Sequence, residues 1–184
     1  MFAQNFDELA DSPFVAAHNR EVISQEIEGV VFKAHVFGQT TLNLERFWSD
    51  VKTYTELQLS IFKEFPVQHY NYLLHFTPYF MHHGVEHTTS TVIVMGHGEN
   101  FDREEKYNEM LAICSHELFH TWNVKTLRPV EMMPYDFTKE NYTQLGYVDE
   151  GVTTYYGDLC LRRSGIWNNE LWKHSLEKWL NTHH

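Results

Sequence analysis

Residues 114–123 read CSHELFHTWN, a stretch that contains the pattern His-Glu-x-x-His. On a helix, residues four apart lie one above the other, so His116 and His120 share a face and Glu117 lies beside them. Two neutral imidazoles can occupy two corners of a tetrahedral zinc ion, while the neighbouring carboxylate stays unligated and handles protons. The stretch therefore predicts a helix that carries a zinc site, with metal-assisted amide hydrolysis as its chemistry.

The third ligand of such a site has to come from elsewhere in the chain. Histidine accounts for 13 of the 184 residues, so the spacing also arises by chance, and a catalytic zinc ion needs three protein ligands and an open fourth position. Glu150 is the best candidate, because a loop between two antiparallel helices can bring it opposite the two histidines. A solvated acid that favours the helix dipole explains this residue equally well. Asp149 points about 100° away around the helix and is expected at best to support a ligand.

Composition limits the class of protein. A chain of 184 residues fits one domain, over residues 1–184, and can bury a sizeable core. Hydrophobic residues make up 42% and aromatic residues 15%, which predicts a packed globule and not a disordered segment. The 14 basic and 25 acidic residues give a formal charge of −11, which argues against nucleic acid and anionic membranes as partners. Cys114 and Cys160 lie in apolar helical patterns, which predicts buried free thiols.

The two ends of the chain say little about the cellular location of the protein. There is no run of about 18 apolar residues, and the first residues, MFAQNFDELADSP, lack the basic and apolar regions of a signal peptide. We therefore expect a soluble chain, whose compartment and oligomeric state the sequence leaves open. Both ends look cut, and we interpret the chain as a piece of a longer protein. His183 and His184 are either native residues or the start of a purification tag.

Hydrophobic periodicity predicts a mixed α+β fold in which a small sheet packs on helices. The predicted elements are two strands within 21–37 around a turn at Glu28-Gly29, a helix from the N-cap Asn43 to just before Pro66, a strand over 69–76, a loop over 77–84, a strand over 86–95, a helix from the N-cap Asp102 through the His-Glu-x-x-His stretch, an irregular segment over 127–138, a helix over 147–163 and a last helix around 171–180. Residues 1–20 show no sustained period and are expected to form a loop. Four further histidines are interpreted as surface or strand residues and not as ligands: His82, His83, His87 and His97.

Three motifs, in this order along the chain, carry a resemblance to a known family. They are HHGVEHTTSTVI at residues 82–93, HELFHTWNVKTLRP at 116–129 and DEGVTTYYGDL at 149–159. Together they closely resemble the catalytic domain of the glycyl aminopeptidase family of zinc metallopeptidases, which are relatives of thermolysin and aminopeptidase N. The resemblance extends from about Asp7 to Gly165. It implies a thermolysin-like α+β fold, without the N-terminal β domain and the C-terminal PDZ domain that full proteins of this family commonly add.

The resemblance also implies the roles of the residues at the metal. His116, His120 and Glu150 correspond to the three protein ligands of one Zn²⁺ ion. Glu117 corresponds to the general base, which takes a proton from the attacking water and passes it to the leaving amine.

A second part of the site is implied upstream of the helix. Gly84-Val85-Glu86-His87 stands where the family has a Gly-x-Glu-His stretch, and there Glu86 would hold the free ammonium of a peptide substrate. Without the family, Glu86 is an ordinary acid at the start of a strand. The tyrosine that stabilises the oxyanion in such enzymes stays unassigned among three that the chain offers: Tyr142, Tyr155 and Tyr156.

The function that the resemblance implies is zinc-dependent peptide hydrolysis, by an aminopeptidase that releases small N-terminal residues such as glycine or alanine. One alternative is a zinc endopeptidase, in which Glu86 is only structural. The other is a zinc-binding or peptide-binding module without activity. The intact Glu117 argues against this last alternative, because a purely structural zinc ion favours a closed shell of four ligands. The isolated catalytic domain is expected to be weakly active.

Overall fold

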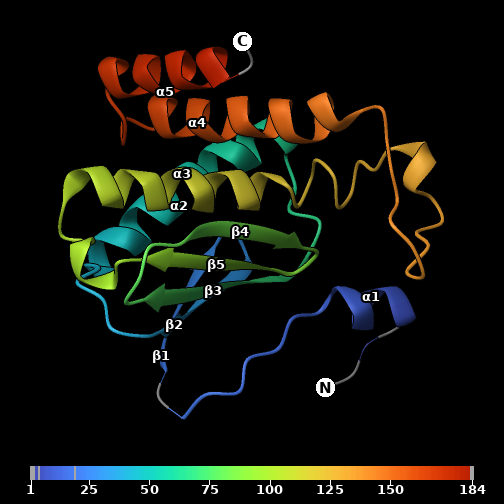
Figure 1. Ribbon diagram of the computed structural model, residues 1–184, viewed down its shortest axis with the longest axis horizontal. Helices are drawn as coiled ribbons and strands as arrows, with labels where there is room; N and C mark the ends of the chain where they lie inside the picture. Colours follow the sequence, from blue (N-terminus) through green and yellow to red (C-terminus); the bar gives the residue numbers. More distant parts are fainter. Residues whose placement is uncertain (1–2, 4, 19, 183–184) are drawn as a thin grey trace.

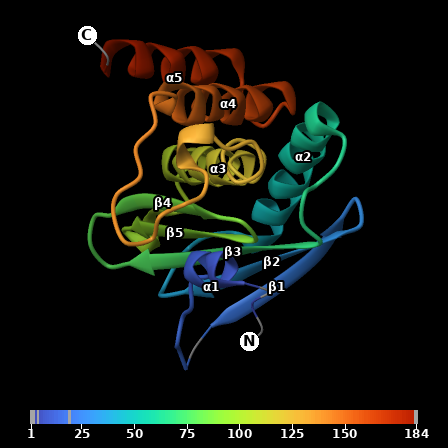
Figure 2. The same cartoon turned by 90° about the vertical axis from the view of Figure 1, so that its right-hand side faces the viewer.

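The described residues form a five-stranded mixed sheet with a stack of helices over one face (Figures 1 and 2). A computed structural model describes residue 3, residues 5–18 and residues 20–182, so His183 and His184 lie outside it. The strands are β1 (Glu21–Ile27), β2 (Val30–Phe37), β3 (His69–Thr77), β4 (His82–His87) and β5 (Ser90–Gly96), in the spatial order β1-β2-β3-β5-β4. The helices are α1 (Phe6–Asp11), α2 (Leu44–Phe62), α3 (Glu104–Phe119), α4 (Thr153–Arg163) and α5 (Asn169–Thr182), with 3-10 turns at Gly98–Asn100 and Val130–Met132 and a π-helix at Tyr147–Val152.

The first hairpin forms where the sequence predicts it. Glu28 and Gly29 both have positive φ angles, 49° and 79°, which is the conformation of the two-residue turn that matches the twist of antiparallel strands. Pairing continues from Ile27 opposite Val30 to Glu21 opposite Val36. β2, β3 and β5 are parallel, and β4 runs antiparallel to β5 at the edge of the sheet.

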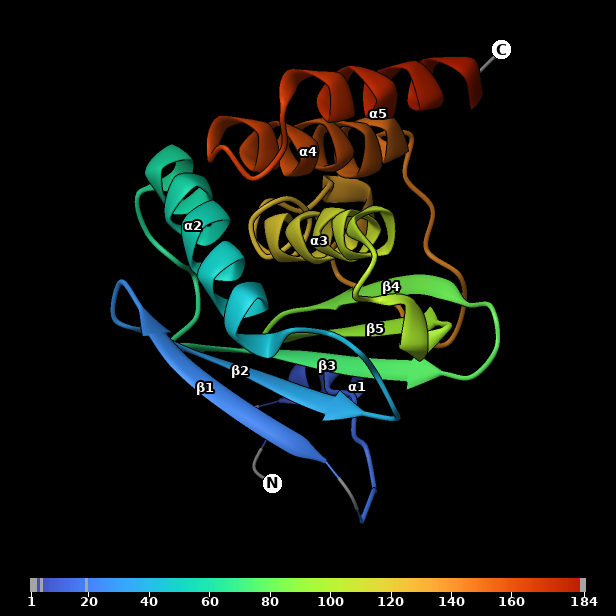
Figure 3. The same cartoon turned by 90° about the vertical axis from the view of Figure 1, so that its left-hand side faces the viewer.

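Helix α2 packs between the sheet and the other helices and contacts β1, α3 and α4 (Figure 3). The predicted N-cap is confirmed, since the Asn43 side chain accepts a hydrogen bond of 3.0 Å from the Arg46 N–H. Phe47, Trp48, Val51 and Tyr54 of the apolar stripe are buried, whereas Ile61 near the end of the helix is exposed. The Tyr54 hydroxyl lies 3.0 Å from the Tyr72 hydroxyl of β3. The helix ends earlier than predicted, because Lys63 adopts the left-handed conformation directly after Phe62.

The predictions for two segments, residues 1–20 and residues 77–95, were wrong. Residues 1–20 contain helix α1, which Asn5 caps by accepting a 2.8 Å hydrogen bond from the Glu8 N–H. None of its residues is buried, so no apolar period announces it. The predicted loop over 77–84 and single strand over 86–95 are two strands, β4 and β5, joined by a turn at Thr88-Thr89. An edge strand that is exposed along one side needs no alternation of apolar residues, which explains why the pattern missed β4.

Helix α3 begins one residue later than predicted. The predicted N-cap Asp102 and its capping box with Glu105 do not form; instead Arg103 precedes the helix without a side-chain cap. A 3-10 turn at Gly98–Asn100 precedes this segment. The Asp102 N–H donates to the Thr41 hydroxyl at 3.1 Å.

The helices follow one another away from the sheet, with α3 against β4 and β5, α4 on α3 and α5 on α4 (Figure 2). Cys114 and Cys160 are buried free thiols, as predicted. Among the described residues, no helix is long and apolar enough to cross a membrane. The mixed α+β class is therefore confirmed, and the His-Glu-x-x-His helix lies between the sheet and α4.

Candidate metal centre

The two histidines of the His-Glu-x-x-His stretch meet at the end of α3. His116 lies in the last turn and His120 is the C-cap residue, so their side chains point to the same face, as the spacing predicts. The Nε2 atoms are 2.9 Å apart. His120 is buried, whereas about a fifth of the His116 side chain is exposed, 21%. This pair therefore presents two nitrogen donors at the rim of the core.

Glu150 reaches both histidines from the next helical segment. Its Oε2 atom lies 3.4 Å from His116 Nε2 and 3.7 Å from His120 Nε2. The three ligand atoms all lie within 4.8 Å of one another, a spacing at which they could hold one metal ion. Contact with the two rings holds the pKa of the Glu150 carboxyl well below its usual range. The side chain is nevertheless 66% exposed, so the group of three is open to solvent on this side.

The segment that carries Glu150 is a π-helix, where a continuous α-helix was expected. π-helices are rare and occur mostly as short insertions at functional sites. The wider turn over Tyr147–Val152 leads directly into α4 at Thr153. Asp149 is buried, and burial raises the pKa of its carboxyl, with the charge of Glu150 acting in the same direction.

Hydrogen bonds at the other ring nitrogens orient both imidazoles. His120 Nδ1 lies 2.8 Å from the Asn123 carbonyl oxygen, which can only accept, so Nδ1 carries the proton and Nε2 is left as the donor atom for a metal ion. His116 Nδ1 lies 3.3 Å from the Thr154 hydroxyl. The Nε2 atoms of both rings lie near the Glu150 carboxylate, at 3.4 and 3.7 Å.

Asn123 connects the two helical segments of the site. Its Nδ2 donates to the carbonyl oxygens of Val148 and Asp149 at 3.0 and 3.2 Å and lies 2.9 Å from the Thr153 hydroxyl. The same residue thus holds the π-helix with its side chain and His120 with its backbone. The sequence shows this asparagine directly after the histidine pair, but no pattern identifies partners that lie 25 to 30 residues further on.

Close packing of α4 on α3 fixes the distance between the two helices that carry the histidines and follow Glu150. A Cβ atom at Gly157 would lie 3.2 Å from the backbone of His116, so a side chain there would push the two helices apart. The Ser115 hydroxyl donates to the Gly157 carbonyl at 2.9 Å, and Gln58 Nε2 of α2 donates to the Ser115 carbonyl at 2.9 Å. Sequence reasoning assigned no role to Gly157.

Glu117 lies on the sheet side of the group. It is 5% exposed, and its Oε2 atom has no hydrogen-bond partner. Burial raises the pKa of the Glu117 carboxyl to about 8, an effect that the charges of Glu86 and Glu150 reinforce and His120 opposes. A Cβ atom at Gly84 would overlap the Glu117 carboxylate, so β4 can approach the helix only with a glycine at this position.

Strand β4 places Glu86 beside Glu117 and His120, but not its sequence neighbours Val85 and His87. A carboxylate oxygen of Glu86, one of Glu117 and a ring nitrogen of His120 all lie within 4.8 Å of one another. Side chains alternate along a strand, so Val85 and His87 face the other side of β4. His87 Nδ1 there contacts Asp11 Oδ1 at 3.4 Å.

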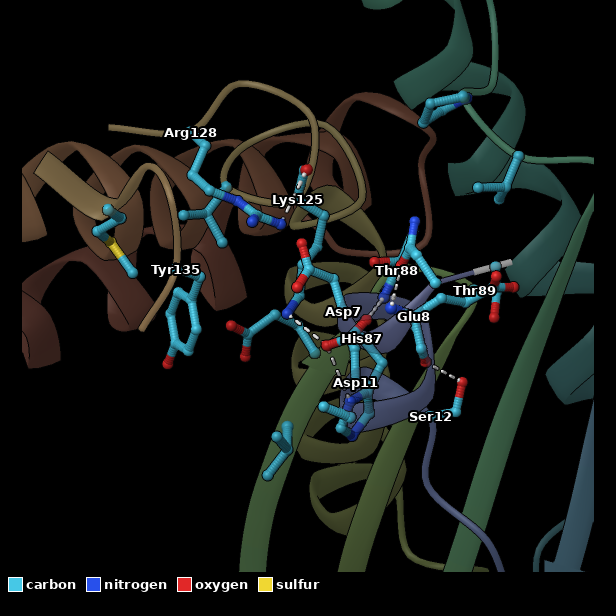
Figure 4. A pocket seen from close by; sticks show the side chains of 18 of the residues that line it. Asp7, Glu8, Asp11, Ser12, His87, Thr88, Thr89, Lys125, Arg128 and Tyr135 are labelled. Atoms are coloured by element: carbon cyan, nitrogen blue, oxygen red, sulfur yellow. Dashed lines mark hydrogen bonds and ion pairs between the residues drawn. The ribbon is translucent and has the colours of Figure 1, made fainter. Parts of the chain in front are cut away.

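A cavity of about 900 Å³ lies between α1, the end of β4 and the segment after α3 (Figure 4). Asp11 of α1 links two walls of the cavity. One of its carboxylate oxygens accepts from the Thr88 N–H, after β4, at 2.7 Å, and the other accepts from Lys125 Nζ, after α3, at 3.0 Å. Burial alone would raise the pKa of Asp11, but the hydrogen bonds with His87 and Thr88 and the charge of Lys125 together hold it below its usual value. Glu86 lines this cavity and also belongs to the group around Glu117.

The three tyrosines considered for the oxyanion lie in different surroundings. Tyr142 is exposed and donates to the Glu140 carboxylate. Tyr156 stacks on Phe119, with ring centroids 5.6 Å apart, and Tyr155 packs edge-on against Tyr156. These contacts do not select one of the three.

Comparison with known proteins agrees with the motifs. Residues 109–184 match the family model described as M61 glycyl aminopeptidase. No curated protein matches the chain. A crystal structure of an aminopeptidase N family protein from Idiomarina loihiensis is similar, with 30% sequence identity and a TM-score of 0.76.

The structural match covers 84% of this chain and 27% of that protein, so the chain spans little more than a quarter of its length. The family match lies in the part of the chain that contains the two histidines and Glu150. The two comparisons together confirm the resemblance to the glycyl aminopeptidase family that the three motifs predict.

Proposed function

We propose that the chain is the catalytic part of a zinc-dependent peptidase, with a thermolysin-like metal site formed by His116, His120 and Glu150. The observation that carries this proposal is the position of Glu150, whose carboxylate lies within 3.4 and 3.7 Å of the two imidazole nitrogens. Two imidazoles and one carboxylate are a common ligand set of catalytic zinc, which keeps its fourth position open.

The surroundings of the three residues fit such an ion. His120 Nδ1 donates to the Asn123 carbonyl oxygen, so its Nε2 atom is free to bind a metal ion, and the Thr154 hydroxyl orients the His116 ring through Nδ1. The low pKa of the Glu150 carboxyl keeps it ionised, as a ligand must be. A zinc ion bound here would supply Lewis-acid polarisation of the scissile carbonyl and a lower pKa for water.

Glu117 is the residue that moves the proton. Its unpaired Oε2 atom accepts a proton from the attacking water as the oxygen forms a bond with the carbonyl carbon. When the C–N bond breaks, the same carboxyl donates that proton to the leaving amine. Because the pKa of Glu117 is raised to about 8, nearby positive charge is needed to make it a base near neutral pH.

Glu86 makes the site that of an aminopeptidase. Its carboxylate lies beside Glu117 and His120 and can hold the free ammonium of a peptide a few ångströms from the metal ligands. A substrate that is fixed in this way presents its first peptide bond for cleavage. The preference for glycine or alanine at the N-terminus rests on the family resemblance.

The cavity beyond Glu86 favours a second candidate, an endopeptidase. With a volume of about 900 Å³, it offers room for residues that precede the scissile bond. Cleavage of a short glycine-initiated peptide, compared with its N-acetylated form, separates the two functions. The aminopeptidase requires the free amine and loses activity on the acetylated peptide, whereas equal rates on both would contradict the role of Glu86.

A variant of the base tests whether the chain is an enzyme at all. Glu117→Gln should retain zinc and lose peptide hydrolysis by a factor of about 10² to 10⁴. If the wild type binds zinc but shows no more hydrolysis than this variant, the chain is a binding module and the proposed function fails.

A further inference from the structure

We propose that Glu86 and Glu117 form a second cation site beside the predicted zinc site, and that a divalent metal ion in excess binds there and excludes the ammonium group of the substrate. The binding part of this inference needs only the geometry of the two carboxylates. Its consequence for turnover rests on the proposed function.

The second site shares one residue with the first. Oxygen atoms of Glu86 and Glu117 and a ring nitrogen of His120 all lie within 4.8 Å of one another. His120 has one free ring nitrogen, because Nδ1 is bonded to the Asn123 carbonyl oxygen. Once that Nε2 atom is engaged with the first ion, a second ion depends on the two carboxylates and on water. The second ion should therefore bind more weakly than the first.

In the described residues, the carboxylate pair has no lysine or arginine partner, and His120 is the basic side chain beside it. Glu117 is 95% buried, as its exposure is 5%, and its Oε2 atom has no hydrogen-bond partner. In the described part of the chain, neither Glu86 nor Glu117 forms an ion pair with a lysine or arginine, and the nearby Lys125 is paired with Asp11. Two carboxylates this close repel each other unless a proton or another cation lies between them.

The backbone holds the pair in position. Gly84 lets β4 approach so closely that the Glu117 carboxylate occupies the space of a missing Cβ atom. Glu86 pairs with Thr91 of β5, and the turn that follows β4 is fixed by the hydrogen bond from the Thr88 N–H to Asp11. The two carboxylates therefore do not depend on a flexible loop to meet.

The ligand types indicate which ions fit. Carboxylate oxygens alone suit Mg²⁺, Ca²⁺ and Mn²⁺, and a neighbouring imidazole shifts the preference toward Zn²⁺. A zinc ion and a peptide ammonium are both cations that would use the same two carboxylates. Occupation by one excludes the other, so zinc in excess should act as a competitive inhibitor.

Titration of the metal-free protein with Zn²⁺, followed by calorimetry, tests the binding. We expect two ions per chain, one bound tightly and one weakly. Glu86→Gln should lose the weak ion and keep the tight one, whereas Glu150→Gln should lose the tight one. Glu26→Gln, which changes an exposed glutamate of β1, should keep both.

The two possible failures can be told apart. A weak ion that persists in Glu86→Gln belongs to other side chains, such as surface histidines, and overturns this inference while leaving the proposed function intact. A tight ion that persists in Glu150→Gln overturns the proposed function instead. A wild type that binds one ion at saturation also contradicts the second site.

Steady-state kinetics give an independent readout. With a free-amine peptide, Zn²⁺ at a concentration equal to the dissociation constant of the weak ion should double KM and leave kcat unchanged. A fall in kcat at constant KM would show that zinc and the peptide bind together, which contradicts shared use of Glu86 and Glu117.

Discussion

The carboxylate of Glu150 lies 3.4 Å from the imidazole of His116, although 34 residues separate them in the chain. Two features of the fold create this contact. The π-helix turns Glu150 toward α3, and Gly157 allows α4 to lie directly on the backbone of His116. The position of the proposed ligand Glu150 therefore depends on residues outside the proposed ligand set, and several of these can be tested.

Asn123→Ala should loosen the segment that carries Glu150. The change removes the hydrogen bonds to the Val148 and Asp149 carbonyls, of which the Asp149 carbonyl keeps the Thr153 hydroxyl as a donor. We expect a loss of about 1–3 kcal/mol in the free energy of unfolding and a zinc affinity lower by about 10- to 100-fold. Denaturant unfolding and zinc titration measure the two effects. Asn181→Ala, at an exposed position of α5, is the control, and equal zinc affinity in the two variants would contradict the role of Asn123.

Gly84→Ala should displace the base without removing the metal ligands. The added methyl group would overlap the Glu117 carboxylate, which has to move. We expect kcat to fall by about 10²-fold or more, since a displaced general base loses most of its contribution, while zinc content stays the same. Gly146→Ala is a matched control, because a Cβ atom there meets nothing within 4 Å. Unchanged kcat in Gly84→Ala would show that Glu117 is not held by this contact.

Asp11→Asn should destabilise the chain in a pH-dependent way. The pKa of Asp11 is lowered in the folded state, so its ionised form stabilises the fold above the unfolded pKa of about 3.9, and this stabilisation is lost as the pH falls below that value. At pH 7 we expect a loss of about 1–3 kcal/mol, typical of hydrogen bonds to a charged group. The difference from the wild type should shrink below about pH 4. Unfolding curves at several pH values check this.

Asp7→Asn provides the control for that series, because Asp7 is exposed on the same helix. A pH-independent difference between Asp11→Asn and the wild type would contradict the assignment of the effect to the Asp11 carboxylate.

The sequence predicts the parts of the fold that follow a local pattern. The turn at Glu28-Gly29, the N-cap Asn43 and the face shared by His116 and His120 all depend on spacings of a few residues, and all three are as predicted. Helix α1 and strand β4 were missed, because polar and exposed elements leave no apolar period in the sequence.

In the candidate site too, contacts between segments that are distant in the sequence could not be predicted. The sequence left Glu150 equally balanced between a ligand and a solvated acid, since nothing local fixes the distance between two helices. Its contact with His116 depends on the π-helix and on Gly157, and neither has a local signal that a single sequence shows. Asn123 was in view within the first motif, but its partners at Val148 and Asp149 became visible only in three dimensions.

The zinc content of the purified protein, compared between the wild type and Glu150→Gln, tests whether Glu150 is the third ligand of a zinc ion. Dialysis against a zinc-free buffer first removes weakly held ions. We expect one zinc ion per wild-type chain and its loss from Glu150→Gln, in which the amide keeps the size of the side chain but not its charge. One zinc ion retained in Glu150→Gln would contradict the assignment of Glu150 as the third ligand.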